Sequence, residues 1–199
     1  MIELDQREDI WTLTINRPDK ANSLTSEMLA DLIQVVKMAD KADLRALILT
    51  GGGDKVFSAG ADLEEAKAGL ALSPLWEELS RAIVRLPCLT IAALNGTLAG
   101  GAFGMVLACD VRLAPAHAKF FYPVAKLGFL PQPSDPRRLA TLVRPARAKM
   151  ILVAGQKITA DEALIWGLVD RLETNSLEAA NALIPEAKAD HMAAIKSMI

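Results

Sequence analysis

The chain has few of the residues that carry strongly charged or metal-dependent functions. Its 199 residues include two cysteines, two histidines and only 5% aromatic residues. Twenty-two basic side chains nearly balance twenty-four acidic ones, and no long run of either sign occurs. Nucleic acids and anionic membranes are therefore not expected as partners, because both call for a concentrated basic surface. No metal site is predicted.

The two thiols and the amino terminus give indications of the cellular compartment of the protein. Cys88 and Cys109 lie in apolar surroundings, which predicts buried, reduced thiols and not a disulfide. The first residues, Met1 to Asp5, have neither the basic region nor the apolar block of a signal peptide. These observations predict a cytoplasmic protein.

One stretch without charge is long enough to cross a bilayer. No charged residue occurs between Arg85 and Asp110. The stretch is interrupted, however, by residues that break helices, namely Pro87, the Asn95-Gly96 pair and the Gly100-Gly101 pair. We therefore predict a buried strand, turn and helix here and no transmembrane segment.

Apolar residues are plentiful, at 52% of the chain, and give enough material for one packed domain. Apolar runs predict strands over residues 10–15 (paired with 2–4), 44–50, 90–94, 118–121 and 167–172. Helices are predicted from Thr25 or Ser26 through Val36, at 62–65, 75–86, 137–143 and 146–153, from 159 onward, and over 177–198 with a break at Pro185. Residues 122–136 are predicted to form an irregular, proline-rich loop. Strands that alternate with helices favour an α/β fold.

The stretch from Thr90 to Ala114 organises the rest of the chain. An apolar, β-branched run meets the Asn95-Gly96 turn, and a glycine-rich segment and an apolar helical run follow. The glycine-rich part carries no side chain that can act as acid or base, but its backbone can approach a ligand closely. Free N–H groups at a helix start point toward an anion. A reaction here would therefore be assisted by backbone N–H groups, which would act as the electrophile toward a negatively charged oxygen.

Two loops share this small-residue character, Ala59-Gly60-Ala61 and Gly100-Gly101-Ala102. Each follows a predicted strand and precedes a helix. One N–H group from each loop, directed at the same carbonyl oxygen, would form an oxyanion hole that stabilises an enolate. Loss of one such donor costs on the order of 3 kcal/mol. The alternative, favoured for either loop alone, is that small residues only let helices pack closely on strands.

Four blocks of sequence occur in a fixed order and span most of residues 1–172. They are Asn16-Arg17-Pro18 with Ala21-Asn22-Ser23-Leu24; Phe57 to Leu63; Ile91 to Gly96 with Ala99-Gly100-Gly101 and Ala108 to Ala114; and Ile158-Thr159-Ala160 with Glu162-Ala163 and Gly167-Leu168-Val169. In this order the blocks resemble the crotonase (enoyl-CoA hydratase/isomerase) superfamily.

The resemblance implies a crotonase-like α/β fold, the ββα-spiral, with an acyl-CoA-binding core at residues 1–172. Residues 173–199 would form a shortened helical tail available for oligomer contacts. It further implies an acyl-CoA thioester as ligand, coenzyme A as part of the substrate and no separate cofactor, and a homotrimer or dimer of trimers. By position, the backbone N–H groups of Ala61 and Gly101 would be the oxyanion donors. The residues that would hold coenzyme A are Lys20, Ala21, Ser23, Leu24, Ser58, Ala59, Asp62 and Leu63.

The chain departs from the hydratases of this superfamily at two positions. Those enzymes carry one glutamate three residues after the oxyanion glycine, where this chain has Gly104. They carry another in the Phe-x-x-Pro segment, where this chain has Val124. Addition of water to a double bond needs a positioned acid and base, and neither residue supplies one. Hydration is therefore disfavoured, and so is isomerisation by a single glutamate at position 124.

Other branches take their acid–base group from the loop after Gly128. In this chain Asp135 is the candidate base, with Tyr122 or Gln132 as a polar group that orients it. The alternative for Asp135 is a helix cap, since an aspartate before a proline is common at a helix start. The two histidines, His117 and His191, are weaker candidates.

We therefore predict an acyl-CoA isomerase or lyase that stabilises a thioester enolate and catalyses isomerisation, decarboxylation or carbon–carbon cleavage. The alternative is an inactive crotonase-like protein that binds acyl-CoA or assembles with a partner, which the missing glutamates and the short tail favour. A dinucleotide-binding domain fits less well, because Ala99 stands where Gly-x-Gly-x-x-Gly needs glycine. A serine peptidase would need a nucleophilic serine in the glycine-rich segment, which has none.

Overall fold

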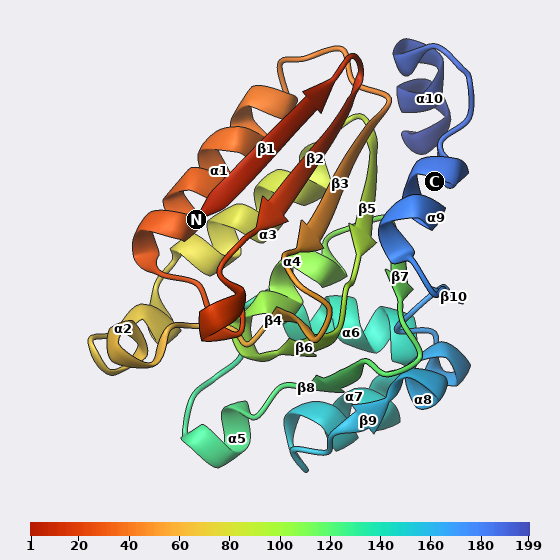
Figure 1. Cartoon of the computed structure of the whole chain (residues 1–199). Coiled ribbons are helices and arrows are strands. Elements are labelled where there is room, and N and C mark those ends of the chain that lie inside the picture. Colours follow the sequence, from red (N-terminus) through yellow and green to blue (C-terminus); the bar gives the residue numbers. More distant parts are fainter.

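Two sheets of unequal size frame the molecule, for which the computed structural model describes residues 1–199 (Figure 1). The large sheet holds, in spatial order, β1 (Ile2–Arg7), β2 (Ile10–Ile15), β3 (Ala46–Gly51), β5 (Leu89–Ala93), β7 (Val111–Ala114) and β10 (Arg171–Leu172). The small sheet holds β4 (Val56–Ser58), β6 (Thr97–Ala99), β8 (Lys119–Phe121) and β9 (Ile158–Thr159).

The strand pairing confirms the predicted α/β fold. β1 and β2 form the predicted pair, which is antiparallel, with Ile2 opposite Ile15. From β2 onward the large sheet is parallel, as are β4, β6 and β8 in the small sheet. Parallel neighbours need long crossover connections, which the helices supply here.

Ten α-helices connect or cover the strands. They are α1 (Ser26–Ala39), α2 (Leu63–Lys67), α3 (Leu75–Arg85), α4 (Phe103–Leu107), α5 (Val124–Leu127), α6 (Asp135–Val143), α7 (Pro145–Leu152), α8 (Ala160–Trp166), α9 (Ser176–Leu183) and α10 (Ala189–Lys196). Thr25 caps α1 by accepting a hydrogen bond from the Met28 N–H, and Thr159 with Glu162 forms the predicted capping box of α8. None of the helices combines the length and apolarity that a bilayer crossing requires.

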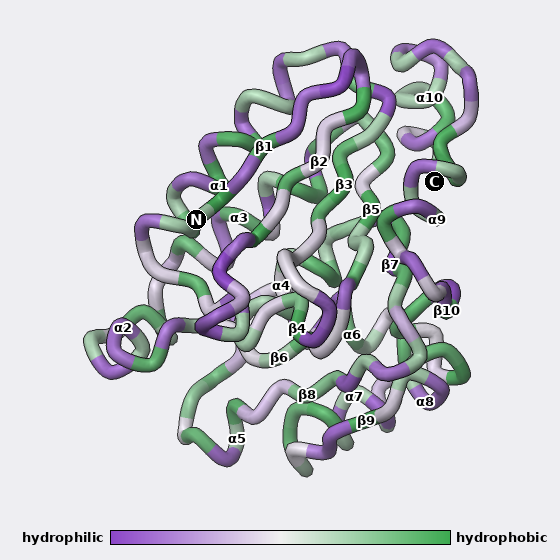
Figure 2. The backbone as a smooth tube through the Cα atoms, in the orientation of Figure 1, coloured by the Kyte–Doolittle hydropathy of each residue, from purple (hydrophilic) through white to green (hydrophobic).

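Alternate residues of the central strands face two different hydrophobic clusters. Leu47 and Leu49 of β3 join the large core that also contains buried residues of α1 and α3, whereas Ala46 and Ile48 join a smaller cluster with α9. This alternation is the two-residue period of a strand. Figure 2 shows mostly hydrophobic residues through β3 and β5, with hydrophilic residues concentrated at outer turns and helix surfaces. The central strand β3 is thus buried on both faces.

The uncharged stretch before Asp110 forms the predicted strand and turn, with one additional strand. After β5, the Asn95 side-chain amide donates to the carbonyls of Gly52, Gly53 and Val56 at 3.0 to 3.2 Å. β6 follows, then a single 3-10 turn over Gly100–Ala102 leads into α4. Every element of the stretch is short, and none is a helix long enough to cross a membrane.

Two local predictions are wrong. The strand expected over 167–172 is reduced to β10, because Gly167 ends α8 in a left-handed conformation with φ of 84°. The loop expected over 122–136 contains α5, a single turn bounded by Pro123 and by Gly128 with φ of 74°. The same loop ends earlier than expected, since α6 begins at Asp135.

The segment after residue 172 covers one face of the large sheet. α9 packs against β3, β5 and β7 (Figure 1). The Arg45 guanidinium donates to the Pro185 carbonyl at 2.8 Å, and Lys196 Nζ donates to Asp110 Oδ2 at 2.6 Å. The tail is therefore integrated with the core of its own chain, and a division at residue 172 and a role in oligomer contacts stay predictions.

Candidate active site

The two small-residue loops meet at one edge of the small sheet. They leave β4 and β6, which are parallel neighbours, so the carboxyl ends of both strands lie at the same edge. Gly60 and Gly100 have φ of 89° and 58°, conformations that favour glycine. A Cβ atom on Gly60 would lie 3.2 Å from the Gly101 nitrogen and 3.1 Å from the Ala99 carbonyl oxygen. The loops contact each other closely, and only small residues permit it.

The backbone donors predicted in these loops are not engaged in regular pairing. Gly60 and Asp62 both hydrogen-bond Leu24, at 2.8 Å each, so the N–H of the intervening Ala61 faces away from that segment. Gly101 is the second residue of its 3-10 turn, a position without an acceptor inside the turn. Neither N–H group has a backbone acceptor among the hydrogen bonds of the loops and turns.

A cavity of about 170 Å³ lies beside these loops. Its wall includes both predicted oxyanion residues and the ring of Trp76, which lies on Gly101: a Cβ atom at position 101 would be 3.2 Å from three ring atoms. The remaining wall is mostly aliphatic or aromatic, contributed by Ala59, Leu63, Ala66, Ala71, Ala99, Gly100, Phe121, Tyr122, Pro123, Val124, Leu127, Phe129, Leu130 and Gln132.

Tyr122 and Asp135 form a buried hydrogen-bonded pair at this cavity. Tyr122 Oη donates to Asp135 Oδ2 at 2.9 Å, and the Tyr122 ring stacks on Phe103 with centroids 5.2 Å apart. Asp135 has no exposed surface, and its Oδ1 atom has no hydrogen-bond partner. Of the two residues, only Tyr122 lines the cavity.

The Asp135 carboxyl group occupies the space above Gly104. A Cβ atom at position 104 would lie 3.0 Å from Oδ1 and 3.3 Å from Oδ2 of Asp135. This is the position where the resemblance places a hydratase glutamate, so the chain brings a carboxyl group to the same neighbourhood from a different element. Val124 lines the cavity but carries no titratable group.

Burial determines the protonation of this pair. Loss of water contact raises the pKa of Asp135 to about 7, and the charge of Glu77 acts in the same direction. The hydrogen bond from Tyr122 and the charge of Arg138 oppose that rise. Burial and the adjacent carboxylate also raise the pKa of Tyr122 above its ordinary value. A carboxyl group that titrates near neutrality is suited to proton transfer.

The helix-cap alternative for Asp135 is wrong. Ser134 occupies the N-cap position of α6, and Asp135 is the first helical residue with its side chain turned to Tyr122. Gln132 does not orient Asp135 with its side chain either, because Gln132 Nε2 donates to the Ala71 carbonyl at 3.3 Å. Of the two predicted orienting groups, Tyr122 is therefore the one in contact.

Two residues of α3 reach the site although the sequence reasoning did not single them out. Trp76 packs on Gly101, as described above, and Glu77 accepts hydrogen bonds from both the Ser134 N–H (3.1 Å) and the Ser134 hydroxyl. Glu77 also accepts from Arg81 Nε at 2.6 Å. The amphipathic pattern of α3 was the only available signal, and it predicts burial of Trp76 without indicating the loop it meets.

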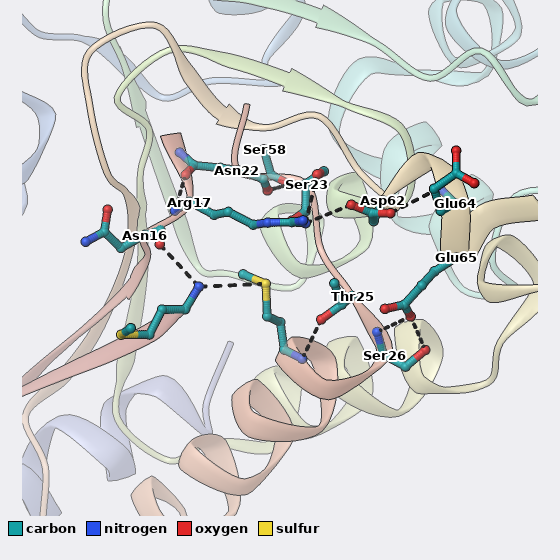
Figure 3. Close-up of polar contacts among 12 residues, drawn as sticks. Asn16, Arg17, Asn22, Ser23, Thr25, Ser26, Ser58, Asp62, Glu64 and Glu65 are labelled. Carbon is teal, nitrogen blue, oxygen red and sulfur yellow. Dashed lines mark hydrogen bonds and ion pairs between the residues drawn. The ribbon is translucent and has the colours of Figure 1, made fainter. Parts of the chain in front are cut away.

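The loop predicted to hold coenzyme A is fixed by Arg17 (Figure 3). Arg17 Nη1 donates to Asp62 Oδ2 at 2.8 Å, to the Ser23 carbonyl at 3.2 Å and to the Ser23 hydroxyl at 3.3 Å. Asp62 also caps α2 by accepting from the Glu64 N–H at 3.1 Å. The hydrogen bond from Arg17 lowers the pKa of Asp62 below its ordinary value. Asp62, as an ion-paired carboxylate, therefore joins the segment that holds Arg17 and Ser23 to the start of α2.

The predicted coenzyme A residues differ in their access to a ligand. Lys20, Ala59 and Leu63 are exposed, and Ala21 is half-buried. Leu24 and Ser58 have no exposed surface, so their assignment as ligand contacts needs correction. The Ser58 hydroxyl donates to the Asn22 carbonyl at 2.8 Å and accepts from the Gly60 N–H, which positions the loop from inside.

Neither histidine belongs to the cavity. His117 is exposed, with its Nε2 atom 2.9 Å from the Asp54 carbonyl oxygen, and His191 is exposed on α10. The cavity wall includes no residue from either neighbourhood.

The chain is similar to known proteins over most of its length. A family model described as enoyl-CoA hydratase/isomerase matches residues 5–198. A short-chain-enoyl-CoA hydratase of Clostridium acetobutylicum is 34% identical over 196 residues, covering 92% of this chain and 75% of the relative. A carnitinyl-CoA dehydratase of Citrobacter koseri is 38% identical over 168 residues, covering 82% and 64%. The solved structure of Pseudomonas aeruginosa DspI has a TM-score of 0.89 and 30% identity, covering 98% of this chain and 84% of that one.

Proposed function

The chain belongs to the enoyl-CoA hydratase/isomerase (crotonase) family, and we propose that it binds an acyl-CoA thioester and stabilises the enolate formed from it. One observation carries this proposal: two loops with available backbone N–H groups touch beside an apolar cavity whose wall includes Tyr122. In the proposed arrangement Ala61 and Gly101 donate to the thioester oxygen, and the donation strengthens as negative charge develops there.

Coenzyme A would enter along the loops that Arg17 joins. Of the predicted contacts, Lys20, Ala21, Ser23, Ala59, Asp62 and Leu63 are the six with some exposed surface. Exposed Lys20 suits a phosphate group, whereas Asp62 acts by holding Arg17 against Ser23. We propose, as the resemblance implies, that the chain assembles as a homotrimer or dimer of trimers in the cytoplasm, without a further cofactor.

Proton transfer would pass through Tyr122 to Asp135. The α-carbon–hydrogen bond breaks as its proton moves to Tyr122 Oη, while the phenol proton moves to Asp135 Oδ2 along the existing 2.9 Å hydrogen bond. The thioester gains the negative charge that the carboxylate loses, so charge is conserved. Return of the proton to the γ-carbon of a 3-enoyl thioester completes an isomerisation. Decarboxylation or carbon–carbon cleavage would use the same pair to protonate the enolate.

Hydration is less favourable than these reactions. It requires a group that activates water and a second group that protonates carbon. Gly104 and Val124 provide neither, and the described pair is one proton-transfer unit. We therefore propose an isomerase or lyase, although the relatives include a protein named a hydratase and one named a dehydratase.

A second candidate function is acyl-CoA binding without turnover. The observation that favours it is the complete burial of Asp135, which leaves no carboxylate in contact with the cavity. On this alternative, the Tyr122–Asp135 pair only stabilises the fold beneath the binding site.

Isotope exchange separates the two functions. Saturated and 3-enoyl-CoA thioesters of four to twelve carbons would be incubated with the protein in heavy water and analysed by mass spectrometry. We expect deuterium at the α-carbon, or a shifted double bond, with the wild-type protein. We expect neither with Asp135→Asn. Intact binding with no deuterium uptake across the panel would support the second candidate instead.

A further inference from the structure

Gly104 stands at a helical position where the backbone itself does not require glycine. It lies in α4 with an ordinary helical conformation, without the positive φ of Gly60 or Gly100. Inside a helix, glycine is less favourable than every residue except proline, because it loses the most backbone freedom on folding. Any requirement for glycine at position 104 therefore comes from what packs against α4.

The group that packs against this position is the Asp135 carboxyl group. Apart from α4 itself, the three atoms nearest to a Cβ atom on Gly104 would be Oδ1, Oδ2 and Cγ of Asp135, at 3.0, 3.3 and 3.5 Å. The two oxygen distances are shorter than the roughly 3.5 to 4.0 Å of a favourable van der Waals contact. A methyl group on residue 104 and the carboxyl group of residue 135 therefore exclude each other at these positions.

The carboxyl group cannot move aside without disturbing its partner. Asp135 Oδ2 accepts the hydrogen bond from Tyr122 Oη at 2.9 Å, and the Tyr122 ring stacks on Phe103, the residue before Gly104. Asp135 is 0% exposed and Tyr122 is 2% exposed, so neither side chain can turn toward solvent without repacking its neighbours. A displaced carboxyl group would therefore weaken the hydrogen bond from Tyr122.

The start of α4 also connects this pair to the proposed oxyanion donor. The 3-10 turn over Gly100–Ala102 ends where α4 begins at Phe103. One short segment therefore supplies the Gly101 N–H, the ring on which Tyr122 stacks and the space that the carboxyl group occupies. The position of the Tyr122–Asp135 pair relative to Gly101 thus depends on this segment.

Resting on the proposed function, we infer that Gly104 is a positioning residue of this site. The absence of a side chain at position 104 admits the Asp135 carboxyl group to the place where Tyr122 donates to it. Gly104 is not part of the cavity wall, so it acts only through Asp135. In this chain, a side chain at position 104 and a carboxyl group paired with Tyr122 are alternatives.

Thermal unfolding of the wild-type protein, Gly104→Ala, Asp135→Ala and the double variant tests this exclusion. In Asp135→Ala, the added Gly104→Ala change should raise the unfolding temperature by about 2 to 4 °C, because the helix gains a better residue and no carboxyl group opposes it. In the wild-type protein the same change should lower that temperature. An equal rise in both proteins would overturn the inference.

Asp161→Ala provides the matched control cycle. Asp161 is an exposed aspartate in the first turn of α8, so its effect and that of Gly104→Ala should add. If Gly104→Ala fails to fold while the double variant with Asp135→Ala folds, the exclusion is confirmed in its strongest form. If neither of them folds, the carboxyl group is not what requires glycine at position 104, and the inference is wrong.

Titration of the Asp135 carboxyl group gives a readout that a purely structural role of Gly104 would not change. NMR of aspartate-labelled protein follows its carboxyl carbon, whose signal is assigned by its loss in Asp135→Asn. The hydrogen bond from Tyr122 is the largest influence that lowers the pKa of Asp135, so weakening it in Gly104→Ala should move the midpoint from about pH 7 to higher pH. An unchanged midpoint would overturn the inference.

The other groups near the carboxyl group stay the same in that titration. Glu77 of α3 and Arg138 of α6 are the charged residues that act on Asp135, and α4 has no charged residue. On α7, Arg147 lies over the Trp166 ring and Lys149 is exposed. Since Gly104→Ala changes no charge, a shifted midpoint reports the position of the carboxyl group.

Turnover separates this inference from the proposed function. In Gly104→Ala, kcat should fall by about tenfold or more because the proton-transfer pair is displaced. KM should stay the same, since residue 104 does not line the cavity. An unchanged kcat would overturn the positioning role. A wild-type protein that exchanges no deuterium with any thioester would instead overturn the proposed function, and the unfolding and titration results, which need no thioester, would still decide whether Gly104 positions Asp135.

Discussion

Asp62 and Asp135 both stand at the amino-terminal end of a helix, yet their surroundings give them opposite properties. Asp62 is the N-cap of α2 and accepts hydrogen bonds from the Arg17 guanidinium and the Glu64 N–H. Asp135 is the first residue of α6, and Tyr122 is the one donor to its carboxyl group. The hydrogen bond from Arg17 lowers the pKa of Asp62, whereas burial raises the pKa of Asp135 to about 7.

The difference shows how one residue type acquires two roles at similar positions. A cation and a backbone N–H stabilise the charged form of Asp62, so that carboxylate serves as a fixed connection between loops. Asp135 has lost its water and gained a single neutral donor, so its charged and neutral forms are close in free energy. Proton transfer needs that balance, and structural connection does not.

The largest expected effect comes from removing the titrating group. Asp135→Asn should lower turnover by about 10² to 10⁴ fold, since an amide cannot take up the proton that Tyr122 releases. The fold should persist, because the amide is similar in shape and avoids burial of a charge. Steady-state rates and thermal unfolding measure the two effects. Asp161→Asn, which changes an exposed aspartate in the first turn of α8, is the control and should alter neither.

Asp62→Asn should show the reverse pattern, because its carboxylate is a structural partner of Arg17. We expect its unfolding temperature to fall by a few degrees and its turnover to fall far less than that of Asp135→Asn. A greater loss of turnover in Asp62→Asn would contradict the assigned difference.

The pH dependence of stability should also separate the two carboxyl groups. The raised pKa of Asp135 makes its contribution to stability fully present below pH 3.8 and lost as the pH rises to about 7. The lowered pKa of Asp62 makes its contribution present above pH 3.8 and lost as the pH falls. Between pH 4 and 7 the free energy of unfolding should therefore decline by up to a few kcal/mol through Asp135, at about 1.4 kcal/mol per pKa unit.

Urea unfolding of the wild-type protein and Asp135→Asn at pH 5 and pH 7.5 measures that decline. The variant has no group that titrates at this position, so its stability should differ less between the two pH values. An equal difference in both proteins would mean that the Asp135 carboxyl group does not titrate in this range.

The sequence allowed Tyr122 and Asp135 to be predicted as candidates, but it did not predict the complete burial of Asp135. The resemblance to branches that take their acid–base group from the loop after Gly128, together with the missing glutamates at 104 and 124, singled out Asp135, with Tyr122 or Gln132 as its orienting group. The structure brings these two together, 2.9 Å apart. It also buries Asp135 outside the cavity wall, with its carboxyl group beside Gly104. That packing depends on contacts between distant elements, and no local pattern encodes it.

Much of the fold, by contrast, was predictable because it depends on local signals in the sequence. Apolar runs, turn residues and helix caps act over short distances, and they gave the longer strands and helices in the right order but missed the three-residue strands β4 and β6. Short elements were missed or misjudged, such as α5 and β10, whose bounds depend on Gly128 and Gly167 entering a left-handed conformation. Leu24 and Ser58 were assigned to a ligand because sequence position does not reveal that tertiary contacts bury them completely.

The smallest expected effect concerns Glu77, and it tests the electrostatic part of the difference between Asp62 and Asp135. Burial alone would raise the pKa of Glu77, but hydrogen bonds from Ser134 and Arg81 bring it below its ordinary value, so Glu77 is charged at neutral pH. Its charge is one of the influences that raise the pKa of Asp135.

Glu77→Gln removes that charge while its amide oxygen can still accept a hydrogen bond from Ser134. The pKa of Asp135 should fall, and the rise of turnover with pH should therefore shift to lower pH, by about one unit or less. Glu78→Gln is a closely matched control: Glu78 is the next residue of α3, and it is exposed and paired with Lys37 at 2.8 Å. The control should leave the pH profile in place. A shift to higher pH in Glu77→Gln would mean that Glu77 acts on Asp135 through Ser134 and the position of α6, and not through its charge.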